Sequence, residues 1–249
     1  MIPILALFGA TYRSALPLRR TVLFGVLSLF PAVLFMLVTE DRTGEAAFEA
    51  LLETSTGSFF ALLLPIISIV IASGALGSER RDQTLSFIVL RPIPRPAVGA
   101  TKIAAAACAA MTINTIGVVG AWAIFAVRHR VDTTLLVGLL VGMAIATIAY
   151  VAVVVPIGFM TDRAVIIGLA YLLVFENGIV IALSGLSPLS PWRVGLAAVG
   201  GIAKETQPVI GDAVGTLTMS AGGSIVTLGI YLAIGVTVTA MLLRRRDLA

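Results

Sequence analysis

The chain has 249 residues, of which 59% are hydrophobic and only 12% are charged, and its mean hydropathy is +1.07. Soluble domains usually carry about a quarter charged residues, so this composition excludes an ordinary water-soluble globule. The net charge of +4 could suit nucleic acid. However, the basic residues lie between apolar segments, as they do in membrane proteins, and we expect no nucleic-acid partner.

Residues 1–20 precede the first apolar span and predict an interfacial helix. Leu5, Phe8 and Tyr12 recur at three- and four-residue spacing, and Arg19 and Arg20 follow at the border of the span. This pattern favours an elbow helix on the cytoplasmic leaflet, with a frayed extension of the first span as the alternative. No basic residue comes before the apolar stretch, so we expect no removable signal peptide.

Six apolar segments are long enough to cross a bilayer core, which takes about 20 residues. The sequence therefore predicts an all-α polytopic membrane protein with one transmembrane domain over residues 1–249. The expected spans cover residues 21–38, 59–77, 103–127, 135–160, 164–183 and 222–243. Pro31, Pro65 and Pro156 predict kinks in three spans. Gly138 and Gly142 predict close helix packing.

The distribution of basic residues predicts the orientation. Six spans put both termini on one side of the membrane, and the side richer in Lys and Arg faces the cytoplasm. Of the 17 basic residues, twelve fall on the side of the termini and five on the other side. We expect a plasma (inner) membrane protein in contact with lipid, with both termini in the cytoplasm.

Two outer segments carry helical patterns. Glu45, Glu49 and Glu53 stand at four-residue spacing, which indicates an amphipathic helix whose acidic stripe we interpret as a solvated face. Residues 184–221 contain the sequence Ser190-Pro191-Trp192, in which serine can cap a helix and proline can begin it. We expect a short external helix there that lies at, or re-enters, the outer leaflet.

The sequence lacks the residues that common catalytic and metal sites need. Its two lysines follow Thr101 and Ala203, so the Gly-Lys pair of a phosphate-binding P-loop is absent. One histidine, His129, and one cysteine, Cys108, cannot make a metal cluster. We therefore expect no catalytic residue, no metal and no cofactor in this chain.

A dense polar segment runs from Gly77 to Lys102 between the second and third spans. Asp82 can cap a helix that begins at Gln83, and Pro92 would end it. Pro94 and Pro96 are expected to keep the following turn extended. The pattern predicts a helix of about two turns across the cytoplasmic mouth of the spans, with its charged start in water; a long amphipathic loop is the alternative.

This segment resembles the signature of ABC-2 type (type V, exporter-class) ABC transporter permeases, in which a Glu, a Gly-Thr-Leu, a Pro, an Arg and a Lys follow at set intervals. The matching residues are Glu79, Thr84-Leu85, Pro92, Arg95 and Lys102. Gln83 stands where the family usually has glycine, and Pro94 where serine is common. Both departures would stiffen the segment without removing a charge.

The resemblance implies a permease that pairs with a second copy, identical or homologous, and binds two copies of a separate ABC ATPase, which would hold ATP and Mg²⁺. The region 78–96 would then contain the coupling helix that enters a cleft on the ATPase. The residues expected to serve this contact are Glu79, Arg80, Arg81, Asp82, Gln83, Thr84, Leu85, Arg91 and Arg95.

Glu176 and Asn177 lie inside the fifth span. A carboxylate within a span is costly and usually faces a cavity or a partner. Permeases of this kind often carry an acid in the fifth span, which makes Glu176 and Asn177 candidates for the transport path. A structural role, with Glu176 hydrogen-bonded to neighbouring helices, is the equal alternative.

The sequence thus predicts the membrane subunit of an ABC exporter that moves a hydrophobic or amphiphilic substrate; drugs, lipids, peptides and antibiotics all stay open. Two other functions are possible. The chain would be a secondary transporter if Glu176 served as a proton site, or a non-transporting membrane anchor if it only recruited an ABC ATPase.

Overall fold

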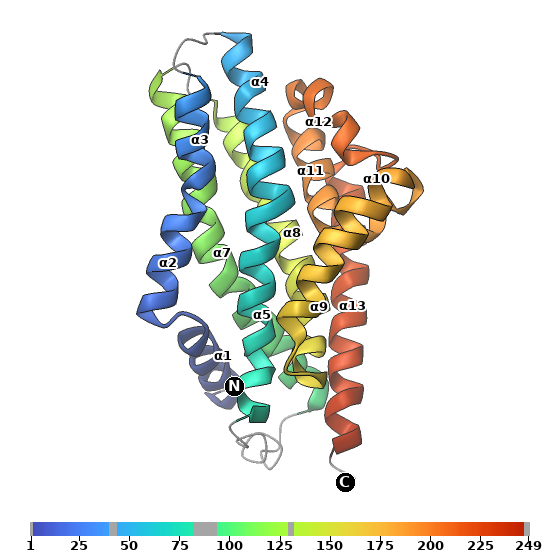
Figure 1. Cartoon of the computed structure of the whole chain (residues 1–249). Helices are drawn as coiled ribbons and strands as arrows, with labels where there is room; N and C mark the ends of the chain where they lie inside the picture. The colour runs from blue at the N-terminus through green and yellow to red at the C-terminus, as the bar shows by residue number, and fades with distance from the viewer. Residues whose placement is uncertain (1, 40–43, 82–93, 129–131, 247–249) are drawn as a thin grey trace.

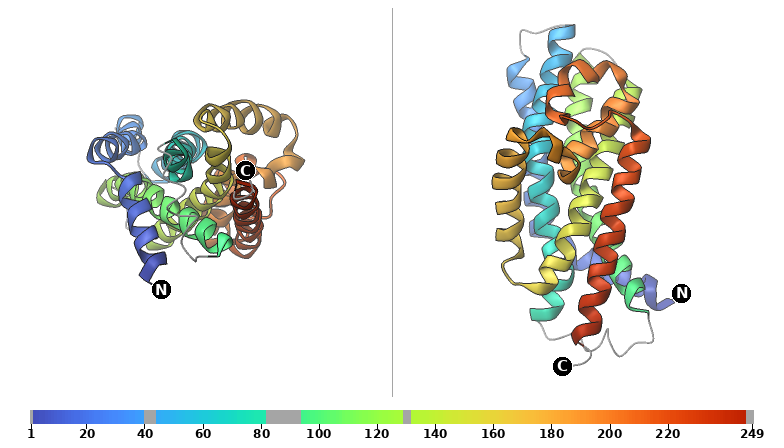
Figure 2. Two further views of the ribbon diagram at one scale, coloured as in Figure 1. Left: turned by 90° about the horizontal axis from the view of Figure 1, so that it is seen from below. Right: turned by 90° about the vertical axis from the view of Figure 1, so that its right-hand side faces the viewer.

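A computed structural model describes residues 2–39, 44–81, 94–128 and 132–246, with the backbone alone for a few of them, including Arg80 and Arg81. Within these ranges the chain is all-helical, as predicted, and its helices form one upright bundle (Figure 1). Helix α1 and the end of α13 lie at one end of the bundle, and α12 lies at the opposite end (Figures 1 and 2). We call these the terminal end and the distal end.

The elements include π-helical segments, η1 and η2, and short 3₁₀ segments, η3 and η4. In chain order they are α1 (Ile2–Ala15), α2 (Leu18–Ser28), α3 (Phe30–Val38), α4 (Glu45–Thr54), η1 (Ser55–Leu63), α5 (Leu64–Arg81), α7 (Arg95–Arg128), α8 (Thr133–Met160), α9 (Ala164–Ala170), η2 (Tyr171–Ile179), α10 (Val180–Ala182), η3 (Ser184–Leu189), α11 (Pro191–Ile202), η4 (Lys204–Thr206), α12 (Gln207–Val214) and α13 (Ala221–Arg246).

Six helical stretches of the described chain are long and apolar enough to cross a membrane, which confirms the predicted number of spans. They cover Leu18–Val38, Glu45–Gly77, Arg95–Arg128, Thr133–Met160, Ala164–Ala182 and Ala221–Arg244. Helix α1 ends at Ala15 and packs against α7, where the hydroxyls of Tyr12 and Thr112 are 3.0 Å apart. Its place on a leaflet surface stays a prediction.

The second span is longer than the sequence suggested, because α4, η1 and α5 follow one another without a break. Its 33 residues would extend about 50 Å, well beyond a hydrocarbon core of about 30 Å. The acidic stripe of Glu45, Glu49 and Glu53 therefore lies on a helical extension of this span, not on a separate loop helix. The run of Glu, Ala and Leu favours this continuation.

The third span begins earlier than predicted, and the expectation that Pro96 holds an extended turn is wrong. Pro96 lies in the first turn of α7, where a missing backbone N–H costs nothing. The carbonyl of Pro94 accepts the backbone N–H groups of Ala97 and Val98, at 2.9 and 3.1 Å, and so starts the helix.

Each proline inside a span marks an irregular turn. The first span breaks at Leu29, and Pro31 lies in the first turn of α3. Pro65 follows the π-helical η1, whose wider turns accommodate its ring. Pro156 cannot donate to the carbonyl of Ala152. There α13 comes close, because a Cβ on Gly235 would lie 2.4 Å from that carbonyl oxygen.

Helix α8 is the centre of the bundle and packs against α5, α7, α11 and α13. Its contact with α11 is a backbone contact between glycines. A Cβ added to Gly142 would lie 2.6 Å from the carbonyl oxygen of Gly195, and a Cβ added to Gly195 would lie 2.5 Å from that of Gly142. The predicted small-residue packing therefore holds α11 against α8.

This contact predicts that Gly142→Ala destabilises the protein by about 1–3 kcal/mol, because the new methyl group must push α11 away. Gly229→Ala is the matched control: Gly229 lies in α13 with no atom within 4 Å of its added Cβ, so the change should be neutral or slightly stabilising. The thermal unfolding midpoint of each purified variant in detergent measures the difference. Equal midpoints would show that the α8–α11 contact tolerates a side chain.

Candidate functional site

Glu176 lies in η2 of the fifth span and has no exposed surface. The Tyr150 hydroxyl donates to its Oε2 at 2.6 Å, and the Ser190 hydroxyl donates to the same oxygen at 2.9 Å. Tyr150 belongs to α8, and Ser190 immediately precedes α11. One carboxylate oxygen of the fifth span therefore bonds to both the fourth span and the residue that starts α11.

Trp192 and Arg193, both buried, occupy the first turn of α11 beside this carboxylate. The Arg193 guanidinium lies 4.6 Å from the centre of the Trp192 ring, interacts electrostatically with Glu176, and donates through Nη1 to the carbonyl of Ala213 at 2.7 Å. Among the described residues, Glu176 Oε1, Trp192 Nε1 and Arg193 Nε have no hydrogen-bond partner. The cluster retains one acceptor and two donors.

The start of α11 agrees with the sequence in position but not in chemistry. Ser190 stands at the N-cap and Pro191 follows at the first position, as predicted. The Ser190 side chain, however, makes no capping hydrogen bond and donates to Glu176 instead. The side chain at this N-cap therefore serves the buried carboxylate of the fifth span and not the backbone of its own helix.

Asn177 does not join Glu176 in one polar group. Its side-chain amide donates at 3.1 Å to the carbonyl of Leu172, five residues earlier in the same π-helical segment. The amide therefore supports the wide turns of η2. The role of Glu176 and Asn177 in a transport path stays a prediction, and the enclosure of Glu176 favours the structural alternative for that residue.

The sequence missed the tyrosines that surround this site. The Tyr171 hydroxyl donates to the carbonyl of Leu189, and the Tyr231 hydroxyl donates to the carbonyl of Pro188 at 3.1 Å. The chain has four tyrosines, and three of them, including Tyr150, bond at or next to the Glu176 site. Only part of a signal existed: a carboxylate in a span needs donors, and three of the four tyrosines lie in spans, but so do many Ser and Thr hydroxyls that could equally have served.

A second charged site lies at the terminal end, where Glu79 in α5 forms an ion pair with Lys102 in α7. Lys102 is 1% exposed and Glu79 is 23% exposed. Glu79 thus belongs to the last turn of α5, which continues through Arg81 and packs against α8, and not to a separate short helix; its contact with an ATPase stays a prediction.

The other residues expected to contact an ATPase are distributed as follows. Arg95 is the first residue of α7 and is partly buried. Asp82, Gln83, Thr84, Leu85 and Arg91, and with them the predicted coupling helix, lie outside the described residues, as do the side chains of Arg80 and Arg81. No group of three or more His, Cys, Asp or Glu side chains gathers in the described ranges.

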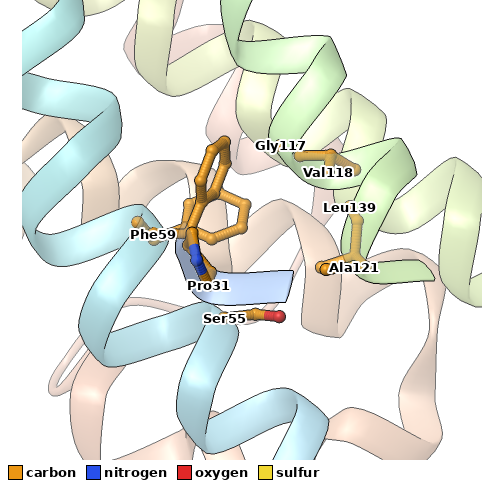
Figure 3. Close-up of a pocket in the computed structure, with 8 residues that line it drawn as sticks. Pro31, Ser55, Phe59, Gly117, Val118, Ala121 and Leu139 are labelled. Carbon is orange, nitrogen blue, oxygen red and sulfur yellow. The ribbon is translucent and has the colours of Figure 1, made fainter. Parts of the chain in front are cut away.

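A small cavity lies between the first four spans, nearer the distal end (Figure 3). Phe59 and Pro31 face it, and Ser55 contributes a hydroxyl at its edge. Its volume of about 10 Å³ is at the lower limit for one water molecule. This cavity cannot hold a substrate in the conformation seen. It is lined by Pro31, Ser55, Phe59, Phe60, Gly117, Val118, Ala121 and Leu139.

The sequence of this helical bundle matches a known protein family. The family model described as ABC-2 family transporter protein matches residues 18–177. The match begins with α2 and ends in η2, directly after Glu176, so it contains the first four spans, most of the fifth and the Glu79–Lys102 pair. No curated protein matches the chain.

The Glu176 site predicts different effects for two substitutions. Glu176→Leu leaves the Tyr150 and Ser190 hydroxyls without their acceptor, at a cost of about 1–3 kcal/mol for each buried group. Glu176→Gln retains a carbonyl oxygen for both donors and should cost much less. Thermal unfolding midpoints in detergent distinguish them, and Asn177→Leu, which removes a bond within one helix, should fall between wild type and Glu176→Leu.

A transport measurement decides between the two roles. If Glu176 is structural, Glu176→Gln transports in proportion to its folded amount. A fully folded Glu176→Gln variant that has lost transport would contradict the structural role and support a place in the transport path.

Proposed function

Since the chain belongs to the ABC-2 family of transporter proteins, we propose that it is the membrane-spanning subunit of an ABC exporter. The family implies association with ABC ATPase subunits. In this proposal, a separate ATPase binds ATP and Mg²⁺, and its hydrolysis drives a hydrophobic or amphiphilic substrate across the plasma membrane. The observation that carries the proposal is the family match, which covers the first four of the six apolar spans and most of the fifth.

The terminal end of the bundle is the proposed ATPase contact. Helices α5 and α7 both reach this end; Arg80 and Arg81 are the last residues of α5, and the segment that joins the two helices carries Asp82 and Arg91. Exposed ion pairs contribute less than about 1 kcal/mol, so such charges do little for the fold. In a protein interface the same charges are partly desolvated and contribute more to binding. Arg95, together with Gln83, Thr84 and Leu85, completes the proposed contact.

We propose that a second copy and lipid cover the outer spans. The first, fifth and sixth spans are 28%, 28% and 17% buried within the chain, whereas the second to fourth are more than half buried. Their exposed side chains are mostly apolar, as contact with lipid or with another apolar helix requires. The pairing can join identical or homologous copies.

The two other functions are less well supported. A proton-coupled transporter would need Glu176 to reach water from alternate sides. In this conformation the carboxylate is enclosed and accepts from Tyr150 and Ser190. A membrane anchor without transport would bind the ATPase but show no substrate stimulation of ATP hydrolysis.

The ATPase contact predicts that Arg91→Glu weakens binding of the partner ABC ATPase. Loss of a desolvated charge pair costs roughly 2–5 kcal/mol, so the Kd should rise at least about tenfold, while the unfolding midpoint stays unchanged. Titration of purified ATPase onto the detergent-solubilised chain measures the Kd. Arg128→Glu, the same change at the exposed distal end of α7, is the control and should leave the Kd unchanged.

An equal Kd for Arg91→Glu and wild type would show that the ATPase binds to another part of the chain. Transport driven by a proton gradient without ATPase would favour the secondary transporter. Unstimulated ATP hydrolysis in the presence of every screened compound would favour the anchor.

The proposed orientation predicts which end of the bundle a membrane-impermeant maleimide can label in intact cells. In a Cys108→Ala background, Asp212→Cys on α12 should react, whereas Arg163→Cys between the fourth and fifth spans should react only after the membrane is opened. Both positions are exposed in the structure, so the membrane alone should cause the difference. The reverse labelling pattern would overturn the cytoplasmic location of the termini.

A further inference from the structure

The Glu79–Lys102 ion pair lies at the point where two closely packed pairs of helices meet. Glu79 is in the last turn of α5, and Lys102 is in the second turn of α7. Lys102 is buried, so its ammonium group has exchanged water for the Glu79 carboxylate. A buried charge tolerates the loss of its partner poorly, which makes the relative position of these two helix ends specific.

Helix α5 is fixed to α8 by backbone contact just before Glu79. A Cβ on Gly77 would lie 3.0 Å from the carbonyl oxygen of Gly158, and a Cβ on Gly158 would lie 2.6 Å from that of Ser73. No side chain separates the two backbones there, so α5 and α8 cannot slide past each other easily.

Helix α7 packs against α13 just before Lys102, less closely and mainly through a side chain. A Cβ on Gly99 would lie 3.2 Å from Thr239 Cγ2 and 3.7 Å from the carbonyl oxygen of Val236. Three residues later, Lys102 reaches across to Glu79. The α5–α8 and α7–α13 pairs also pack directly on each other, and the ion pair adds the charged contact between them at the terminal end.

From this arrangement we infer that Glu79 and Lys102 are positioning residues that make the two helix pairs respond as one unit when the ATPase acts on this end. The inference rests on the proposed function and refines it: Glu79 does not contact the ATPase but transmits its action to the fourth and sixth spans. In this inference, the basic residues around the joining segment bind the ATPase, and the Glu79–Lys102 ion pair transmits its action to the fourth and sixth spans.

The test uses the full complex of the chain with its ABC ATPase in lipid nanodiscs. A cysteine at the exposed Asp212 position, in a Cys108→Ala background, reports on the distal end through its rate of reaction with maleimide. The probe is ATP–Mg²⁺ with vanadate, which needs no knowledge of the substrate. The variants are Glu79→Gln, Lys102→Met and the double exchange Glu79→Lys with Lys102→Glu.

Each single variant should bind the ATPase with unchanged Kd but show a nucleotide-induced change in labelling rate that is reduced roughly threefold to tenfold. The double exchange restores an ion pair and should recover much of the change. Measurements below the unfolding midpoint of every variant separate transmission from stability, and the double exchange keeps the test valid if a single variant does not fold.

Three results would overturn the inference. A normal nucleotide response in folded Glu79→Gln and Lys102→Met would show that the pair only stabilises the fold. A raised Kd for Glu79→Gln alone would return Glu79 to the ATPase contact. If the wild-type chain binds no ATPase, the proposed function itself fails, and the inference fails with it; if the wild type responds and the variants do too, only the inference fails.

Discussion

A charged group enclosed between helices has no water to bond with, so the chain itself must supply its partner. Glu176 and Lys102 are the two charges for which this constraint is most demanding, since one is fully and the other almost fully enclosed. Each is satisfied only where separate helices meet. The carboxylate of Glu176 needs α8 and the start of α11, and the ammonium of Lys102 needs the end of α5. The two charges thus fix the arrangement of helices at two levels of the bundle, Lys102 at the terminal end and Glu176 in the middle part.

Close glycine contacts lie beside both buried charged groups. Hydroxyl and carboxylate groups must approach within about 3 Å to bond, so the helices that carry them must lie close together. Gly142 and Gly195 bring α11 against α8 on the same two elements that present Tyr150 and Ser190. Gly77 and Gly158 bring α5 against α8 beside Glu79, although the ion pair itself joins α5 to α7. At the Glu176 site, packing and polar pairing therefore depend on each other, because neither contact forms at a larger separation of α8 and α11.

The spans could be predicted because length and lack of charge identify them without any knowledge of packing. The failures have a common cause, which is that packing decides them. Glu79 and Lys102 are 23 residues apart, and both were read as parts of a docking segment; nothing local shows that α5 continues far enough for them to meet. Ser190 was correctly placed at a helix start, but its hydroxyl bonds to a residue 14 positions earlier. The π-helical segments have no sequence pattern of their own, although a proline follows η1.

Helix α8 connects the two charged sites, and its local structure limits how it can do so. Tyr150 bonds to Glu176 in the middle part of the bundle, and Gly158, eight residues later, contacts α5 beside Glu79, a distance of about 12 Å along a helix. Pro156 lies between them and removes one backbone hydrogen bond from that stretch. The carbonyl it leaves, that of Ala152, faces Gly235 of α13, the helix that also packs against Gly99 near Lys102. The stretch of α8 that lacks this hydrogen bond is therefore covered by the sixth span. On our proposal that the Glu79–Lys102 pair transmits the action of the ATPase, this contact is where a movement of α13 would reach the part of α8 that leads to Tyr150. In this way the ion pair, the proline and the buried carboxylate belong to one continuous set of contacts through the bundle.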